Sequence, residues 1–180
     1  KASPFKLALN KLVLDNISLN YDDLQSGNSI KIENLQHTGK GDFSSAILDY
    51  VSNTNIDKLS IKKGIVTYLK DAKITLDNKL NIDQKNYKYS FKDTKLSLND
   101  LGLLFNGSVQ LPDSTKTEMD VNFRADKTTF KSLLSLIPAI YTKDFDDLKS
   151  SGNLEFNGSA KGALQGNSYP AFALNLKVDN

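Results

Sequence analysis

Apolar and polar residues alternate with a period of two along most of this 180-residue chain. Apolar side chains at every second position, separated by Lys, Asn, Asp, Ser and Thr, are typical of β-strands with one buried and one solvated face. The clearest runs are Phe5, Leu7 and Leu9; Ile17, Leu19 and Tyr21; Ile74, Leu76, Leu80 and Ile82; Tyr87, Tyr89 and Phe91; Met119, Val121 and Phe123; and Phe172, Leu174, Leu176 and Val178. The pattern predicts a mainly β fold.

Clusters of turn-forming residues separate these runs, at spacings that suit antiparallel hairpins. The clusters are Asp15-Asn16, Gln25 to Ser29, Thr38 to Gly41, Asp93-Thr94, Asn99-Asp100, Pro112 to Thr115 and Gln165 to Pro170. We therefore expect a meander of neighbouring antiparallel strands.

Two glycines are predicted to lie inside strands rather than at turns. Asn106-Gly107 resembles a hairpin signal, but the apolar residues before and after it keep the same parity, which a two-residue turn would break. Gly158 repeats the case, and the tetrad Phe-Asn-Gly-Ser begins at both Phe105 and Phe156. Since glycine inside a strand often marks a bend, both positions indicate a curved sheet.

One segment has a helical period. Its apolar stripe consists of Phe130, Leu133, Leu134 and Ile137, and Pro138 follows as a stop signal. The spacing predicts one short amphipathic helix that packs on the sheet. Ser45 to Val51 is a weaker helical candidate, which its Tyr50-Val51 pair also makes compatible with a strand.

The expected fold is a single β domain over residues 1–180, with a curved antiparallel β-sheet and the short helix. Many one-sided strands expose a large apolar surface that something must cover. A second sheet would make a sandwich, whereas a curved sheet would leave an apolar groove for a ligand. The residues alone leave both arrangements open and slightly favour the sandwich, since a groove would need an apolar ligand or more protein to cover it.

Composition excludes several classes of function. Basic and acidic residues nearly balance at a net charge of +2, and Arg124 is the only arginine, so we expect no nucleic-acid partner. The chain has no cysteine, and His37 is the only histidine, so histidine-based triads and the common zinc sites cannot be built. We expect no enzyme, no catalytic residue, no metal and no cofactor.

The C-terminal half resembles the C-terminal region of the AsmA family of Gram-negative envelope proteins, relatives of the TamB-like proteins. The resemblance rests on a glycine-containing strand from Leu101 to Leu111, a strand ending at Phe123 and Arg124, the Leu-rich segment before Pro138, and a strand with Gly152, Gly158 and Gly162. It spans about residues 91–180.

This resemblance implies a periplasmic protein whose apolar β-sheet binds or conducts phospholipid, or another acyl-chain lipid, in outer-membrane biogenesis. The family's inner-membrane anchor would lie outside this chain, which we expect to be a fragment of a longer protein. The candidates to face such a groove are the apolar residues of the alternating strands, namely Leu101, Leu103, Phe105, Val109, Leu111, Met119, Val121, Phe123, Leu154 and Phe156. The alternative is a structural or adhesive β-sandwich that binds a partner protein or glycan through its lysine- and asparagine-rich face.

Overall fold

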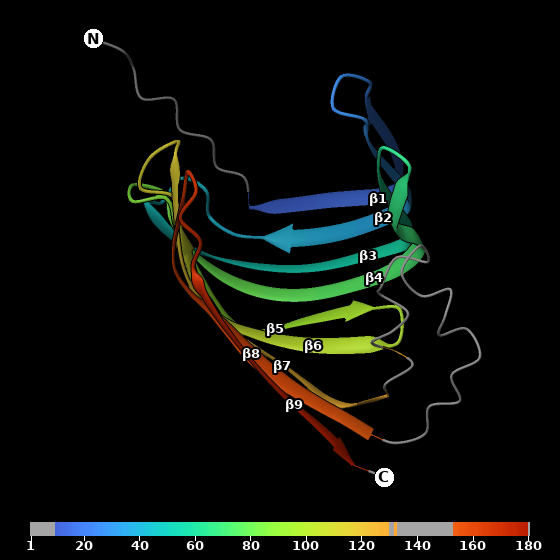
Figure 1. Cartoon of the computed structure of the whole chain (residues 1–180). Helices are drawn as coiled ribbons and strands as arrows, with labels where there is room; N and C mark the ends of the chain where they lie inside the picture. The colour runs from blue at the N-terminus through green and yellow to red at the C-terminus, as the bar shows by residue number, and fades with distance from the viewer. Residues whose placement is uncertain (1–9, 130–131, 133–152, 180) are drawn as a thin grey trace, which may run out of the picture.

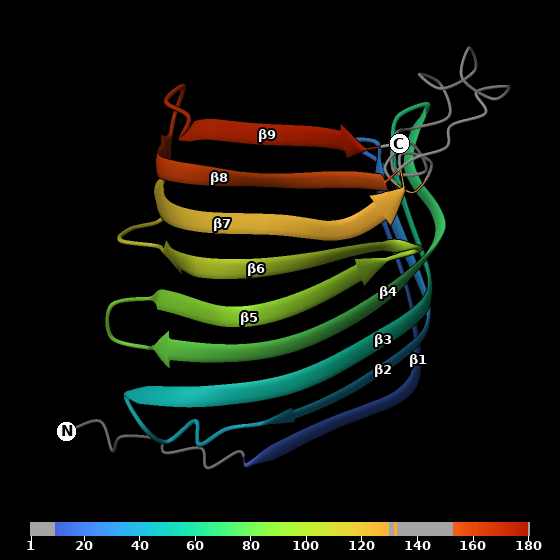
Figure 2. The same cartoon turned by 90° about the horizontal axis from the view of Figure 1, so that it is seen from below.

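The described part of the chain is one open antiparallel sheet in which chain order and spatial order are the same. The computed structural model describes residues 10–129, 132 and 153–179. Its strands are β1 (Lys11–Asp23), β2 (Asn28–Lys40), β3 (Ile47–Lys63), β4 (Val66–Asp83), β5 (Lys88–Leu98), β6 (Leu101–Gln110), β7 (Lys116–Thr129), β8 (Asn153–Gln165) and β9 (Ala171–Asp179). Each strand pairs with its neighbours in the chain, so β1 and β9 are the two edges (Figure 2). The predicted antiparallel meander is confirmed.

The sheet is strongly curved. In Figure 1 the hairpins at both ends of the strands rise on the same side, so the sheet forms a trough. All nine strands belong to this one sheet, and no second sheet is present among the described residues. The sandwich arrangement is therefore wrong for this part of the chain, and the curved single sheet is what remains.

The two in-strand glycines are confirmed. Gly107 lies within β6, opposite Phe91 of β5 and Val121 of β7, and Gly158 lies within β8, opposite Phe123. Their positions follow from the alternation because a pleated strand keeps every second side chain on one face whether or not a glycine interrupts it.

The predicted helix is not borne out. The described residues contain no helical element. Within Phe130 to Ile137 only Ser132 is described, and Phe130, Leu133, Leu134 and Ile137, the stripe residues, lie outside the described part. The weaker helical candidate near Tyr50 is wrong, because β3 starts at Ile47 and runs through it.

Two of the predicted turns are bulges inside strands. Asp15 and Asn16 lie within β1, where the register shifts between Leu14 and Ile17. Likewise, Asp93 lies within β5, beside another register shift. Asp and Asn occur in turns and in bulges alike because they tolerate the left-handed backbone conformation better than other non-glycine residues.

Asn or Asp residues with a left-handed backbone recur in four of the first five strands, β1, β2, β4 and β5. Asn16, Asn34, Asp71 and Asp93 have φ of 52°, 53°, 50° and 51°. At each of these positions two polar residues follow one another and interrupt the alternation. After them the apolar residues move from even to odd positions, or from odd to even. In β1, for example, Leu14 before the bulge and Ile17 after it both lie on the apolar face, because their partners in β2 are His37 and Leu35.

These bulges explain the direction of the curvature. In β4, Lys70 and Asp71 together oppose the single residue Ser60, so the extra residue lies on the polar face. An added residue lengthens its face of the sheet and bends the strand away from it. The polar face is therefore the outer, convex face, and the apolar face lines the hollow of the trough.

Replacing Asn16 tests the role of the left-handed position. Asn16→Val should lower the free energy of unfolding by about 1–2 kcal/mol, because a β-branched residue is strained at positive φ. Asn16→Gly should leave it within about 0.5 kcal/mol, since glycine adopts this conformation freely. Urea denaturation followed by circular dichroism measures both, and equal losses for the two variants would contradict the prediction.

Aspartates close several of the hairpins and loops. Asp23, Asp42, Asp83 and Asp113 each accept a hydrogen bond from the backbone N–H two residues later, at 2.8–3.0 Å. Further hydrogen bonds from Ser, Asn or Thr side chains lower the pKa of each carboxyl. The turn after Asp83 was not among the predicted turns. Asp83 followed by Lys85 and Asn86 is nevertheless typical of an Asx turn, in which the aspartate accepts hydrogen bonds from the next backbone N–H groups.

Candidate functional site

All nine strands place apolar residues on the concave face of the sheet. Residues paired in antiparallel register have their side chains on the same face, so one row can be followed across the sheet. Ile17, Leu35, Ile56, Ile74, Leu98 and Leu101 form such a row from β1 to β6. The row of Tyr50, Leu80, Phe91, Gly107, Val121, Ala160 and Phe172 runs from β3 to β9.

Nine of the ten predicted groove residues lie in strands on this face. Leu101, Leu103, Phe105 and Val109 come from β6, Met119, Val121 and Phe123 from β7, and Leu154 and Phe156 from β8. Their pairings agree, since Phe105 opposes Phe123 and Val109 opposes Met119. Leu111 lies just beyond the end of β6 and is 39% exposed.

Part of this set forms a closed core rather than an open surface. Leu101 and Leu154 are 1% and 0% exposed, and they cluster with the buried Ala125 and Phe156. Phe123 contacts both Phe105 and Phe156, with ring centroids 6.2 and 6.3 Å apart. Leu101 and Leu154 thus stabilise the sheet and cannot contact a ligand without a rearrangement.

The exposed part of the apolar face lies toward the edges. In β9, Phe172, Leu174, Leu176 and Val178 are 71%, 64%, 52% and 54% exposed. Leu19 and Tyr21 of β1 are each 52% exposed. Exposed apolar residues in contiguous rows, rather than scattered singly, are typical of a binding surface.

Sequence reasoning missed the contribution of β1 to β4 to this face. The signal was present, because two adjacent polar residues mark each point where the apolar parity switches, as at Glu33-Asn34 and Asp57-Lys58. Read without the switch, the alternation in these strands breaks into short runs. Read with it, each of the first four strands places its apolar residues on one side of the sheet.

A patch of polar residues interrupts the apolar face. We call it the polar band; its members come from β2 to β5 and are His37, Tyr50, Ser52, Thr54, Asn78 and Thr94. His37 lies between two hydroxyls, with Nδ1 2.8 Å from Thr54 Oγ1 and Nε2 2.8 Å from Tyr50 OH. Burial raises the pKa of the Tyr50 phenol.

The tyrosine of the band packs over a glycine of the neighbouring strand β2. A Cβ atom at Gly39 would come within 1.8 Å of the Tyr50 hydroxyl oxygen, so this ring occupies the space that Gly39 leaves open. Phe43 packs edge-on against the same ring at a centroid distance of 5.5 Å. His37 and Tyr50 are thus held in place by backbone and ring contacts.

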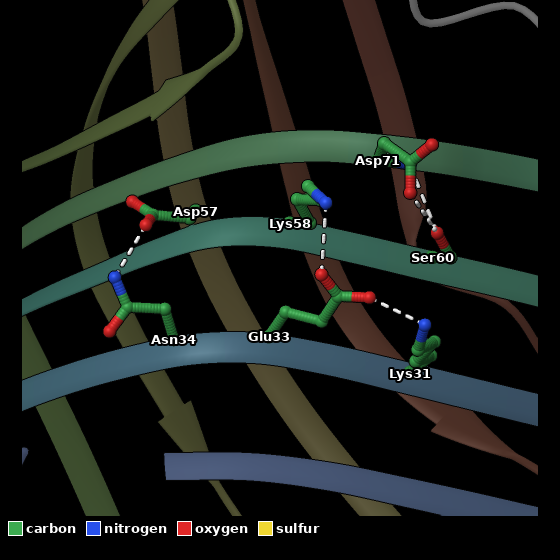
Figure 3. Close-up of polar contacts among 7 residues, drawn as sticks. All are labelled: Lys31, Glu33, Asn34, Asp57, Lys58, Ser60 and Asp71. Atoms are coloured by element: carbon green, nitrogen blue, oxygen red, sulfur yellow. Dashed lines mark hydrogen bonds and ion pairs between the residues drawn. The ribbon is translucent and has the colours of Figure 1, made fainter. Parts of the chain in front are cut away.

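The convex face is covered by charged and amide side chains. Glu33 binds Lys31 and Lys58, the latter with its Nζ 3.0 Å from Glu33 Oε2, and Asn34 donates to Asp57 at 2.5 Å (Figure 3). Hydrogen bonds from the two lysines lower the pKa of Glu33. In Figure 3 these side chains stand in front of β2 to β4, with strands of the C-terminal half behind, as expected for the outer face. Such exposed pairs contribute to solubility more than to stability.

Within residues 10–129, 132 and 153–179, no group of three or more His, Asp or Glu side chains could hold a metal ion. The same residues include no helix with the length and apolarity needed to cross a membrane. No protein-family model, no curated protein and no solved structure matches the chain. The resemblance to the AsmA family therefore stays a prediction from the residues.

Proposed function

We propose that this chain is a non-enzymatic domain that binds acyl-chain lipid on the concave face of its sheet. One observation carries the proposal: all nine strands place apolar residues on one face of a curved sheet, and no second sheet covers that face among the described residues. The resemblance to the AsmA family adds the setting. The full-length protein would be periplasmic, anchored in the inner membrane by a segment outside this chain, and would bind or conduct phospholipid in outer-membrane biogenesis.

The energetics of acyl-chain binding suit such a surface. Each methylene group moved from water to an apolar environment contributes about 0.8 kcal/mol, so a chain of ordinary length binds without specific contacts to its headgroup. The exposed rows of β1 and β9 offer apolar contacts of this kind. Low selectivity for the headgroup follows.

The non-enzymatic part of the proposal rests on the chemistry of the two faces. The single histidine is engaged at both ring nitrogens by hydroxyls, and the acidic residues of the bulges and turns are exposed or half-exposed on the outer face or in loops. Neither arrangement provides the buried acid and base that general catalysis requires.

Charged substitutions on the two faces test the proposal. Phe172→Asp, at a position already 71% exposed, should reduce binding of a fluorescent phospholipid at least tenfold without unfolding the sheet, because it places a charge where the acyl chain lies. Ala173→Asp, its neighbour on the outer face of β9, should bind as wild type does. Phe105→Asp and Ser108→Asp make the same comparison in β6, with circular dichroism as the check on folding.

Failure of the wild type to bind would overturn the proposal. If the purified chain binds no phospholipid under conditions where a known lipid carrier does, the alternative function gains support. The chain would then be an interaction domain that contacts a partner protein or glycan through its lysine- and asparagine-rich outer face.

A further inference from the structure

The polar band contains hydrogen-bond donors that the protein itself does not use. Thr94 Oγ1 donates to Asn78 Oδ1 at 2.8 Å, which leaves the Asn78 Nδ2 hydrogens without an acceptor among the described residues. Ser52, only 7% exposed, likewise makes no side-chain hydrogen bond within that part of the chain. Unused donors on an apolar surface lose their hydrogen bonds to water when an apolar ligand covers them, which is costly unless the ligand supplies an acceptor.

These two donors lie next to each other. Ser52 of β3 and Asn78 of β4 are register partners in the antiparallel pair, so their side chains stand side by side on the concave face. Thr94 is buried beside Asn78, at 8% exposed, and holds the orientation of its amide. The pair therefore presents an O–H and an N–H group to the same region.

Among the described residues, no side chain with a full charge lies next to the pair on the concave face. Asp77, Lys79 and Lys95 line a pocket together with Ser52 and Asn78, but they alternate with the pair along the strands and so lie on the outer face. The band contains no Lys, Arg, Asp or Glu, and the apolar residues of its own strands lie on both sides of it. Toward one end of the strands these are Ile56, Ile74, Leu76 and Leu96, and toward the other end Leu48, Leu80, Ile82 and Phe91. Such a site suits a neutral acceptor that is itself flanked by hydrocarbon, whereas a phosphate or carboxylate would lack a counter-charge.

We propose that Ser52 and Asn78 bind the ester carbonyl oxygens of a diacyl lipid. This inference rests on the proposed lipid binding and adds the part of the lipid that is recognised. Carbonyl oxygens are uncharged acceptors and sit where the polar end of the molecule meets the acyl chains. The chains then lie along the apolar rows beside the band.

A pair of lipids that differ only in these carbonyls tests the inference. Diester and diether phosphatidylcholines with the same chains are compared as competitors for a bound apolar fluorophore, 1-N-phenylnaphthylamine. Wild-type protein should prefer the diester about tenfold, as two hydrogen bonds of ordinary strength imply. Ser52→Ala and Asn78→Asp should each reduce that preference about threefold or more while the fluorophore still binds. Asn78→Asp keeps the acceptor oxygen for Thr94, and Ser90→Ala on the outer face is the control that should change nothing.

The outcomes separate this inference from the proposed function. Equal competition by diester and diether lipids in the wild type overturns the ester site but leaves acyl-chain binding intact. A preference that survives in both variants also overturns it, because the carbonyls would then be bound elsewhere. If neither the fluorophore nor either lipid binds, the proposed function itself fails.

Discussion

Gly107→Ala is expected to lower the free energy of unfolding by about 3 kcal/mol. Gly107 has a φ of 138°, and a Cβ atom there would come within 2.0 Å of the backbone oxygen of Asp120 on β7. Backbone cannot move aside as a flexible side chain can, so β6 and β7 would have to separate locally. The change would therefore weaken strand pairing in the middle of the sheet.

Gly102→Ala in the same strand is the matched control. Nothing lies within 4 Å of a Cβ atom built at Gly102, and its φ is not in the left-handed region. Alanine there should be neutral or stabilise by up to about 0.5 kcal/mol, because glycine inside a strand loses more backbone entropy on folding. Urea titrations of both variants decide the matter, and similar midpoints would mean that the close approach at Gly107 is not rigid.

Leu101→Ala should cost about 2–5 kcal/mol, the range observed for fully buried leucines. Leu101 is 1% exposed in the cluster with Ala125, Leu154 and Phe156, where truncation leaves a cavity that a curved, hydrogen-bonded sheet closes poorly. Leu24→Ala, in the first hairpin at 94% exposed, should change stability by less than about 0.5 kcal/mol. A loss below about 1 kcal/mol for Leu101→Ala would show that the cluster is not a core.

The apolar parity of the C-terminal strands could be predicted because it is a local property. From Leu101 to Val109 every odd residue is apolar or glycine, and the structure keeps that strand unbroken. The candidate face in β6 to β8 followed from the same reasoning. No signal of this kind was recognised for the polar band, because His37, Thr54 and Asn78 are distant in sequence and meet only through strand pairing.

The bulges show where local reasoning was insufficient. Asp15-Asn16 and a true hairpin such as Asn99-Asp100 contain the same residue types, and Asn16 and Asn99 have nearly equal φ of 52° and 51°. Whether the chain reverses or continues depends on the strand beside it, since the hydrogen bonds of β2 carry β1 past its bulge. The parity switch after each bulge was the available clue.

The sequence by itself determined that the chain forms one-sided antiparallel strands, because the period of two and the turn residues act within a few positions of each other. The tertiary structure decided that the strands form one open sheet and not two packed sheets. It also decided which face is concave, since each bulge adds its extra residue to the polar side. Both outcomes depend on pairing between residues far apart in the chain, such as Asn34 with Asp57, which no local pattern specifies.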